Sequence, residues 1–177
     1  WRGTASLDGV YLDYLMHHAS NLALGFALGH GLAVRTGAAF WSVAGFAIAA
    51  GWAGLSLHDD CRYKAFFARL KREGRSYRVD GGSGGKSAPA PPWPRRGLRA
   101  VTWPAYKACE AHVVLLSLSA LALVAIVAPE LWTLGWRVWV AGMAVLAPVL
   151  AFGRAGLALR NGRVEDEFGQ WFRTEPG

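Results

Sequence analysis

Four long apolar stretches dominate the chain, at about 12–34, 38–57, 108–128 and 131–159. Each is close to or longer than the roughly 20 residues with which a helix crosses about 30 Å of hydrocarbon. They are rich in Ala, Leu and Gly, lack the alternation of strands, and would have to satisfy their backbone groups internally in lipid. The pattern predicts an all-α, polytopic integral membrane bundle with four transmembrane helices.

The connections between these stretches predict the orientation of the bundle. Two of them are short, the "RTG" at 35–37 and the "PEL" at 129–131. The long connection, 59–107, carries twelve Lys or Arg residues against four acidic ones, and the C-terminal tail is basic too. Because basic segments stay on the cytoplasmic side, we expect the loop, both termini and any active site there to face the cytoplasm, in a cell (inner) membrane.

The long connection divides into two parts by composition. Residues 59–75 form a basic, amphipathic continuation of the second helix, and residues 81–96 are rich in Gly, Ser and Pro, which is typical of a flexible linker. The "GGKS" at 84–87 lacks the earlier glycine of a phosphate-binding loop, because that position is Asp80. We therefore expect one membrane domain, 1–177, with a cytoplasmic basic loop at 59–107.

Composition agrees with a membrane protein. Hydrophobic residues make up 53% of the chain and charged ones 18%, with nine tryptophans and a net charge of +7. The basic residues flank apolar stretches, so they indicate topology and give no reason to expect nucleic acid. Cys61 and Cys109 form neither a metal-binding pattern nor a disulfide framework. Gly25, Gly29 and the Gly or Ala residues at 45, 49, 51 and 54 favour close helix packing.

Polar side chains cluster at the start of the first apolar stretch, in "GVYLDYLMHH" at 9–18. Asp13 and His17 are four residues apart and share one helix face, which Asn21 and Gly25 continue. An acid within a membrane helix normally faces a cavity or a partner, whereas an acid at the interface costs little and can be a plain polar anchor. Both interpretations of Asp13 stay open on this ground.

The spacing of this segment resembles a known signature. Gly9, three residues, Asp13, three residues and His17 are similar to the second half of D-x2-D-G-x2-A-R-x8-G-x3-D-x3-D, the pattern of the class I CDP-alcohol phosphatidyltransferase family. Eight residues, 1–8, precede Gly9, so the arginine of the pattern would fall just before Trp1. The resemblance implies that these helices are the third to sixth of a six-helix fold and that the chain is part of a longer one.

The resemblance also implies an activity in phospholipid synthesis. A CDP-alcohol donor would transfer its phosphoalcohol or phosphatidyl group to the hydroxyl of an acceptor alcohol, with release of CMP and with Mg²⁺ or Mn²⁺ as the cofactor. A homodimer among membrane lipids is the implied assembly. Without the first half of the pattern, the resemblance implies an inactive relative or a need for a partner chain.

Individual roles follow from the resemblance. Asp13 would be a metal ligand, and His17 stands where the family has an aspartate that resembles a general base. An imidazole ordinarily titrates nearer neutral pH than a carboxylate does, which suits a base. Gly9, Arg154 and Lys107 are the predicted substrate-binding residues. Further polar residues could complete the pocket or act as interfacial anchors: His58, Asp59, Asp60, Glu110 and His112.

Two other functions compete with this one. His17 and His30 are thirteen residues apart in one apolar stretch, a spacing that can stack two haems, with His112 as one possible partner ligand. The chain could instead be a non-enzymatic membrane scaffold that uses its small residues for helix packing and its basic loop for anionic lipids.

Overall fold

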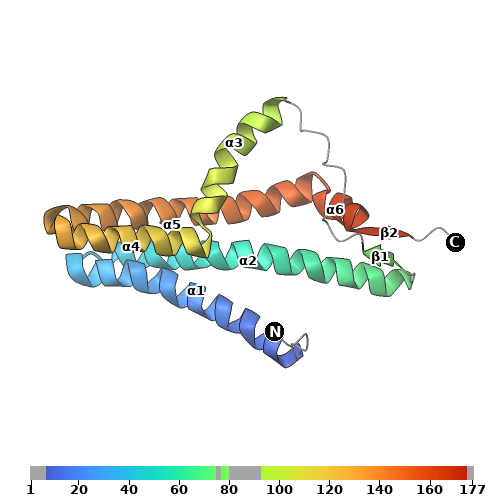
Figure 1. The fold of residues 1–177 in the computed structure, drawn as a ribbon, viewed down its shortest axis with the longest axis horizontal. Helices are drawn as coiled ribbons and strands as arrows, with labels where there is room; N and C mark the ends of the chain where they lie inside the picture. The colour runs from blue at the N-terminus through green and yellow to red at the C-terminus, as the bar shows by residue number, and fades with distance from the viewer. Residues whose placement is uncertain (1–6, 75–76, 80–92, 175–177) are drawn as a thin grey trace.

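The computed structural model describes residues 7–74, 77–79 and 93–174 and is built almost entirely of helices (Figure 1). In chain order, the elements are α1 (Leu7–Thr36), α2 (Phe40–Glu73), β1 (Tyr77–Val79), α3 (Trp93–Ala108), α4 (Ala111–Val127), α5 (Pro129–Arg160), α6 (Arg163–Trp171) and β2 (Phe172–Thr174). Helices α1, α2, α4 and α5 run lengthwise in the bundle, and α3 projects from it at an angle (Figure 1). The predicted helical bundle is confirmed at this level.

Two of the helices, α2 and α5, are long and apolar enough to cross a membrane. A third span results if Thr102–Ala108 and Ala111–Val127, which meet at a bend of 68°, are counted together. Within the described residues α1 is not among these spans, because His17, His18, Asn21 and His30 interrupt its apolar run. The structure therefore supports two or three of the four predicted spans.

Helix α2 lies between α1 and α5 and packs against both. The contact with α1 is made backbone to backbone, since a Cβ atom on Gly29 would lie 2.4 Å from the Cα atom of Gly45. The contact with α5 is equally close, because a Cβ atom on Gly51 would lie 2.5 Å from the carbonyl carbon of Ala147. These contacts confirm the packing role predicted for the small residues.

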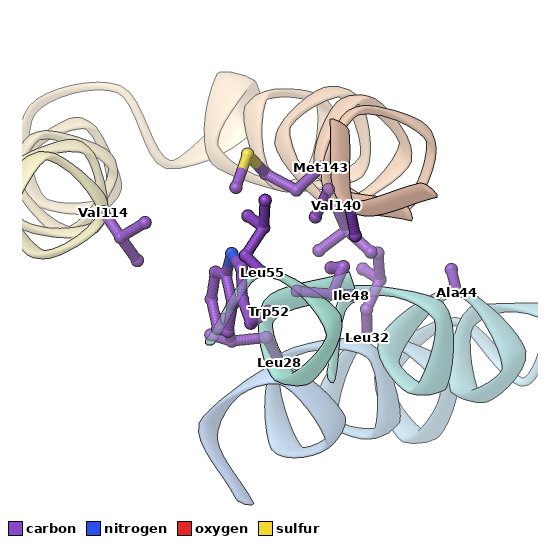
Figure 2. Packing of buried hydrophobic residues seen from close by; sticks show 11 residues of the cluster. Leu28, Leu32, Ala44, Ile48, Trp52, Leu55, Val114, Val140 and Met143 are labelled. Atoms are coloured by element: carbon purple, nitrogen blue, oxygen red, sulfur yellow. The ribbon is translucent and has the colours of Figure 1, made fainter. Parts of the chain in front are cut away.

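The hydrophobic core fills the space that these close contacts leave between the three helices. Leu32 of α1, Ile48 of α2 and Val140 of α5 are fully buried and lie together (Figure 2). Helix α4 joins this core through Val114, and the indole N–H of Trp139 on α5 donates to the Ser117 hydroxyl of α4 at 2.9 Å. One core thus connects all four lengthwise helices.

The two predicted turns are as short as expected, although both lie a few residues away from the predicted positions. Helices α1 and α2 are separated by residues 37–39, where Gly37 adopts a positive φ of 71° that suits glycine. The "PEL" segment is helical, because α5 begins at Pro129, and only Ala128 separates α4 from α5. Proline at this first position needs no N–H partner, which explains why a helix begins where a turn was predicted.

The basic continuation of α2 is helical, as predicted. At about 1.5 Å per residue the 34 residues of α2 span about 50 Å, well beyond a hydrocarbon layer of about 30 Å. The predicted loop at 59–107 is therefore helical at both ends, from 59 to 73 and from 93 to 107, and only the second of these helices was not predicted. Most of the predicted linker, 81–92, lies outside the described residues, and its last residues, 93–96, begin α3.

Helix α6 packs against this continuation. The rings of Phe66, Phe168 and Phe172 form a cluster with centroid separations of 5.0 to 5.9 Å. Arg62 binds Glu167 at 2.7 Å, and Arg69 pairs with Glu165. Strands β1 and β2 pair antiparallel and join the segment after α2 to the end of the chain, a contact that no sequence pattern predicted.

The Gly29–Gly45 contact predicts a specific sensitivity to one methyl group. We expect Gly29→Ala to lower the stability of the protein by about 1–3 kcal/mol, because the added Cβ forces two backbones apart. Gly31→Ala is the matched control: it lies in the same helix with nothing within 4 Å of its added Cβ, so it should keep or slightly raise stability. Thermal unfolding in one detergent measures both, and equal midpoints would contradict the packing account.

Candidate functional site

A cavity of about 410 Å³ opens between α1, α2 and the junction of α3 with α4. Its apolar and small lining residues are Leu24, Trp52, Leu55, Cys109, Ala111, Val114 and Leu115. Its polar lining residues are His17, Asn21, Ser56, Asp59, Tyr106, Glu110 and His112. The site therefore combines an apolar wall with seven polar side chains, which is the usual makeup of a small-molecule pocket.

Helix α1 contributes one face to this cavity. His17, Asn21 and Leu24 lie four and three residues apart, so they stand above one another along the helix. Asp13 lies one turn before His17 and is exposed outside the lining, because α1 diverges from α2 toward its N-terminal end (Figure 1). Gly9 lies in the first turn of α1, where only the backbone is described. Of the predicted motif residues, only His17 belongs to the cavity.

The junction of α3 and α4 places Glu110 in the wall. Glu110 has an extended backbone (φ −71°, ψ 139°), and its carbonyl accepts from the N–H groups of Val113 and Val114, which begins α4. The Lys107 ammonium binds one Glu110 carboxylate oxygen at 2.6 Å, and the His112 Nε2 atom lies 3.4 Å from the other. Lys107, predicted to bind substrate, is thus an ion-pair partner of Glu110 and does not line the cavity.

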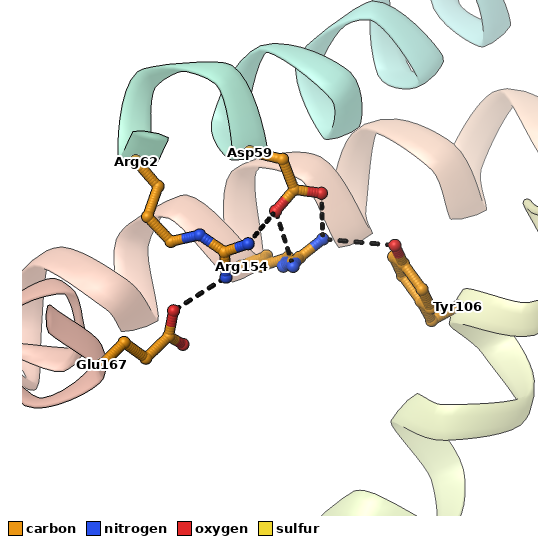
Figure 3. A network of polar contacts seen from close by, with 5 residues as sticks. All are labelled: Asp59, Arg62, Tyr106, Arg154 and Glu167. Atoms are coloured by element: carbon orange, nitrogen blue, oxygen red, sulfur yellow. Dashed lines mark hydrogen bonds and ion pairs between the residues drawn. The ribbon is translucent and has the colours of Figure 1, made fainter. Parts of the chain in front are cut away.

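Asp59 connects the cavity to a polar network at the same end of the bundle (Figure 3). Arg154 of α5 donates two hydrogen bonds to the Asp59 carboxylate, at 3.0 and 3.3 Å, and one to the Tyr106 hydroxyl at 3.4 Å. Arg62 lies 3.3 Å from Asp59 and binds Glu167 of α6. Arg154, predicted to bind a phosphate, forms a bidentate pair with the Asp59 carboxylate in this structure.

Trp52 brings an unpaired donor to the site. Its side chain is buried and lines the cavity, and its indole Nε1 atom has no hydrogen-bond partner within the described residues. Burying a donor without a partner costs about 1–3 kcal/mol, so such groups are uncommon. A ligand oxygen beside Trp52 would remove this cost.

The other histidines lie outside the cavity, except His112. His18 contacts Asp60 at 3.1 Å, which ties α1 to the continuation of α2. The His30 ring lies 3.3 Å from the Ser42 hydroxyl and stacks on Phe26 at 5.5 Å between centroids. Of the two histidines in the haem hypothesis, His17 lines the cavity and His30 contacts the start of α2, near the turn.

The described residues do not make a complete site for Mg²⁺ or Mn²⁺. They contain no group of three His, Cys, Asp or Glu side chains that could hold a metal ion. Asp13, the predicted ligand, stands apart from the cavity, and the Asp59 carboxylate is already bound by two guanidinium groups. Asp13 remains a single candidate ligand.

Some of the residues that line the cavity were predicted from the sequence, and others were not. Asn21 was placed on the face of His17, and Asp59, Glu110 and His112 were named as possible pocket residues; all four line the cavity, whereas His58 and Asp60, named with them, do not. Trp52, Ser56, Tyr106 and Cys109 were missed. For Ser56 a signal existed, since it lies three residues before Asp59 and so on the same helix face.

Comparison with known proteins identifies no relative. No family model, curated protein or solved structure matches the chain.

The Asp59 network predicts unequal effects of two neighbouring carboxylates. Asp59→Ala removes the carboxylate that Arg62 and Arg154 share and leaves Arg154 without an acidic partner, so we expect a loss of roughly 1–3 kcal/mol of stability. Asp60→Ala is the matched control: it removes only a half-exposed pair with His18 and should cost under about 1 kcal/mol. The midpoints of thermal unfolding of the two variants measure these losses, and a larger loss of stability for Asp60→Ala would contradict the central role of Asp59 in the network.

Proposed function

We propose that the chain is an integral membrane transferase of the CDP-alcohol phosphotransferase type, in which the cavity holds the acceptor alcohol. The observation that supports this most is the position of His17. The residue at the last position of the signature resemblance lines the cavity, together with Asn21 and Asp59. In this proposal α1 also crosses the membrane, in addition to the three spans that α2, α5 and the bent α3–α4 pair can provide. The end of the bundle with the cavity and the basic continuation of α2 faces the cytoplasm.

The reaction can be written with the residues that the cavity supplies. The acceptor hydroxyl oxygen forms a bond to the β-phosphorus of the CDP-alcohol, the bond from that phosphorus to the bridging oxygen breaks, and CMP leaves. The hydroxyl proton passes to the His17 imidazole, which acts as a general base. Asn21 and Asp59 position the acceptor by hydrogen bonds at the same wall.

The mixed lining supports a reaction at a membrane surface. The polar residues His17, Asp59 and Glu110 lie toward the end where α1 starts and α2 continues past its apolar part, whereas Leu24 and Leu115 lie further into the apolar segments. A soluble or headgroup alcohol can reach such a mouth from water while apolar parts of a lipid stay in the bilayer.

Activity is tested by release of CMP, which does not depend on which alcohol the donor carries. The purified protein in nanodiscs is offered a panel of CDP-alcohols and acceptors with Mg²⁺. We expect His17→Ala to lower the rate about 100-fold or more and to remove the fall in rate at acidic pH, because a protonated imidazole cannot accept the proton.

His30→Ala is the matched control, since it lies in the same helix but outside the cavity, and it should keep the wild-type rate and pH profile. Full activity of His17→Ala at every pH would refute the base assignment. Absence of CMP release from every donor and acceptor would refute the transferase proposal itself.

A further inference from the structure

We propose that the ligand group bound in the cavity is an uncharged polyol, a group with several hydroxyls and no net charge. The inference rests on the proposed function in taking this cavity as the acceptor pocket, and it names the class of acceptor. It follows from two properties of the lining: the balance of its charges, and the mixture of hydrogen-bond donors and acceptors that it presents.

The charges around the cavity compensate one another. Asp59 and Glu167 are matched by Arg62 and Arg154 in one connected network, and Glu110 is matched by Lys107. Within the described part of the chain, no Lys or Arg side chain belongs to the lining, although the carboxylates of Asp59 and Glu110 do. A ligand with a net charge would have to displace one of these pairs or stay without a counter-charge.

The lining offers both donors and acceptors of hydrogen bonds. The carboxylates of Asp59 and Glu110 accept, the Trp52 indole N–H can only donate, and the groups of Asn21 and Tyr106 do both. A hydroxyl group donates one hydrogen bond and accepts others, so several hydroxyls can satisfy this set together.

Anionic and cationic alcohols fit the charges and hydrogen-bonding groups of this lining only in part. A phosphate oxygen accepts but cannot donate, so a phosphorylated alcohol would set its negative charge against Asp59 and Glu110. An ammonium group adds only donors, and its positive charge would gain a counter-charge only if Asp59 or Glu110 gave up its Arg or Lys partner. The uncharged polyol is the class that uses the whole lining.

Three ligands with the same hydroxyl-bearing chain separate these classes: sorbitol, its 6-phosphate and N-methylglucamine, which are uncharged, anionic and cationic at pH 7. Saturation-transfer NMR on the wild-type protein, in nanodiscs of uncharged phosphatidylcholine, gives a dissociation constant for each. We expect sorbitol to bind at least about tenfold more tightly than either charged analogue. Adding monoacylglycerol to the nanodiscs tests whether a lipid headgroup supplies the polyol, in which case the sorbitol signal falls by competition.

Substitutions in the lining test whether sorbitol binds in this cavity. Trp52→Phe keeps an aromatic ring but removes the N–H, and should weaken sorbitol binding about fivefold, the size expected for one hydrogen bond. Glu110→Gln should weaken it by a similar factor, whereas Glu130→Gln, an exposed acid at the start of α5 and outside the lining, should not. Circular dichroism confirms that each variant is folded.

Equal or tighter binding of the phosphate or of N-methylglucamine would overturn the inference, as would sorbitol binding that neither cavity variant changes. Sorbitol binding without any CMP release would leave the inference standing and remove the proposed reaction. CMP release that requires a charged acceptor would support the proposed reaction and overturn the inference that the acceptor is an uncharged polyol.

Discussion

The close approach of three helix backbones is the constraint on which the rest of this structure depends. Helix α2 contacts α1 through Gly29 and Gly45 and contacts α5 through Gly51 and Ala147, so that no side chain separates the backbones at these points. In lipid, where apolar side chains gain little by leaving their surroundings, such contacts provide packing energy that larger residues would prevent. The core around Ile48 and Val140 is closed only at this spacing.

The same packing determines what lies at the basic end of the bundle. Because α2 and α5 stay packed together beyond Gly51 and Ala147, Asp59 and Arg154 come within hydrogen-bonding distance, and Arg62 extends the network to α6. On the other side, α1 diverges from α2 and leaves the space that the α3–α4 junction borders. The cavity thus forms where α1 separates from α2. The charge of Asp59 in its lining is balanced because the contact between α2 and α5 brings Arg154 beside it.

The sequence allowed most of the fold to be predicted but only part of the site. Apolar stretches predict α2, α4 and α5 because length and hydropathy are local properties, and Gly29 and Gly51 show where helices touch. The bend of 68° between α3 and α4 was not predicted, because the apolar stretch at 108–128 does not show that Glu110 has an extended backbone. Likewise Arg154 seemed free for a phosphate, because its partner Asp59 is distant in sequence and α2–α5 packing alone brings them together.

The central claim is that the cavity binds an alcohol beside His17, and the native Cys109 in its wall can report this directly. In a Cys61→Ser variant, which removes the exposed thiol outside the cavity, the rate of alkylation of Cys109 by N-ethylmaleimide is measured with and without sorbitol. The account predicts that sorbitol slows the reaction severalfold in a saturable manner, while N-methylglucamine at equal concentration does not. An alkylation rate that sorbitol leaves unchanged would contradict it.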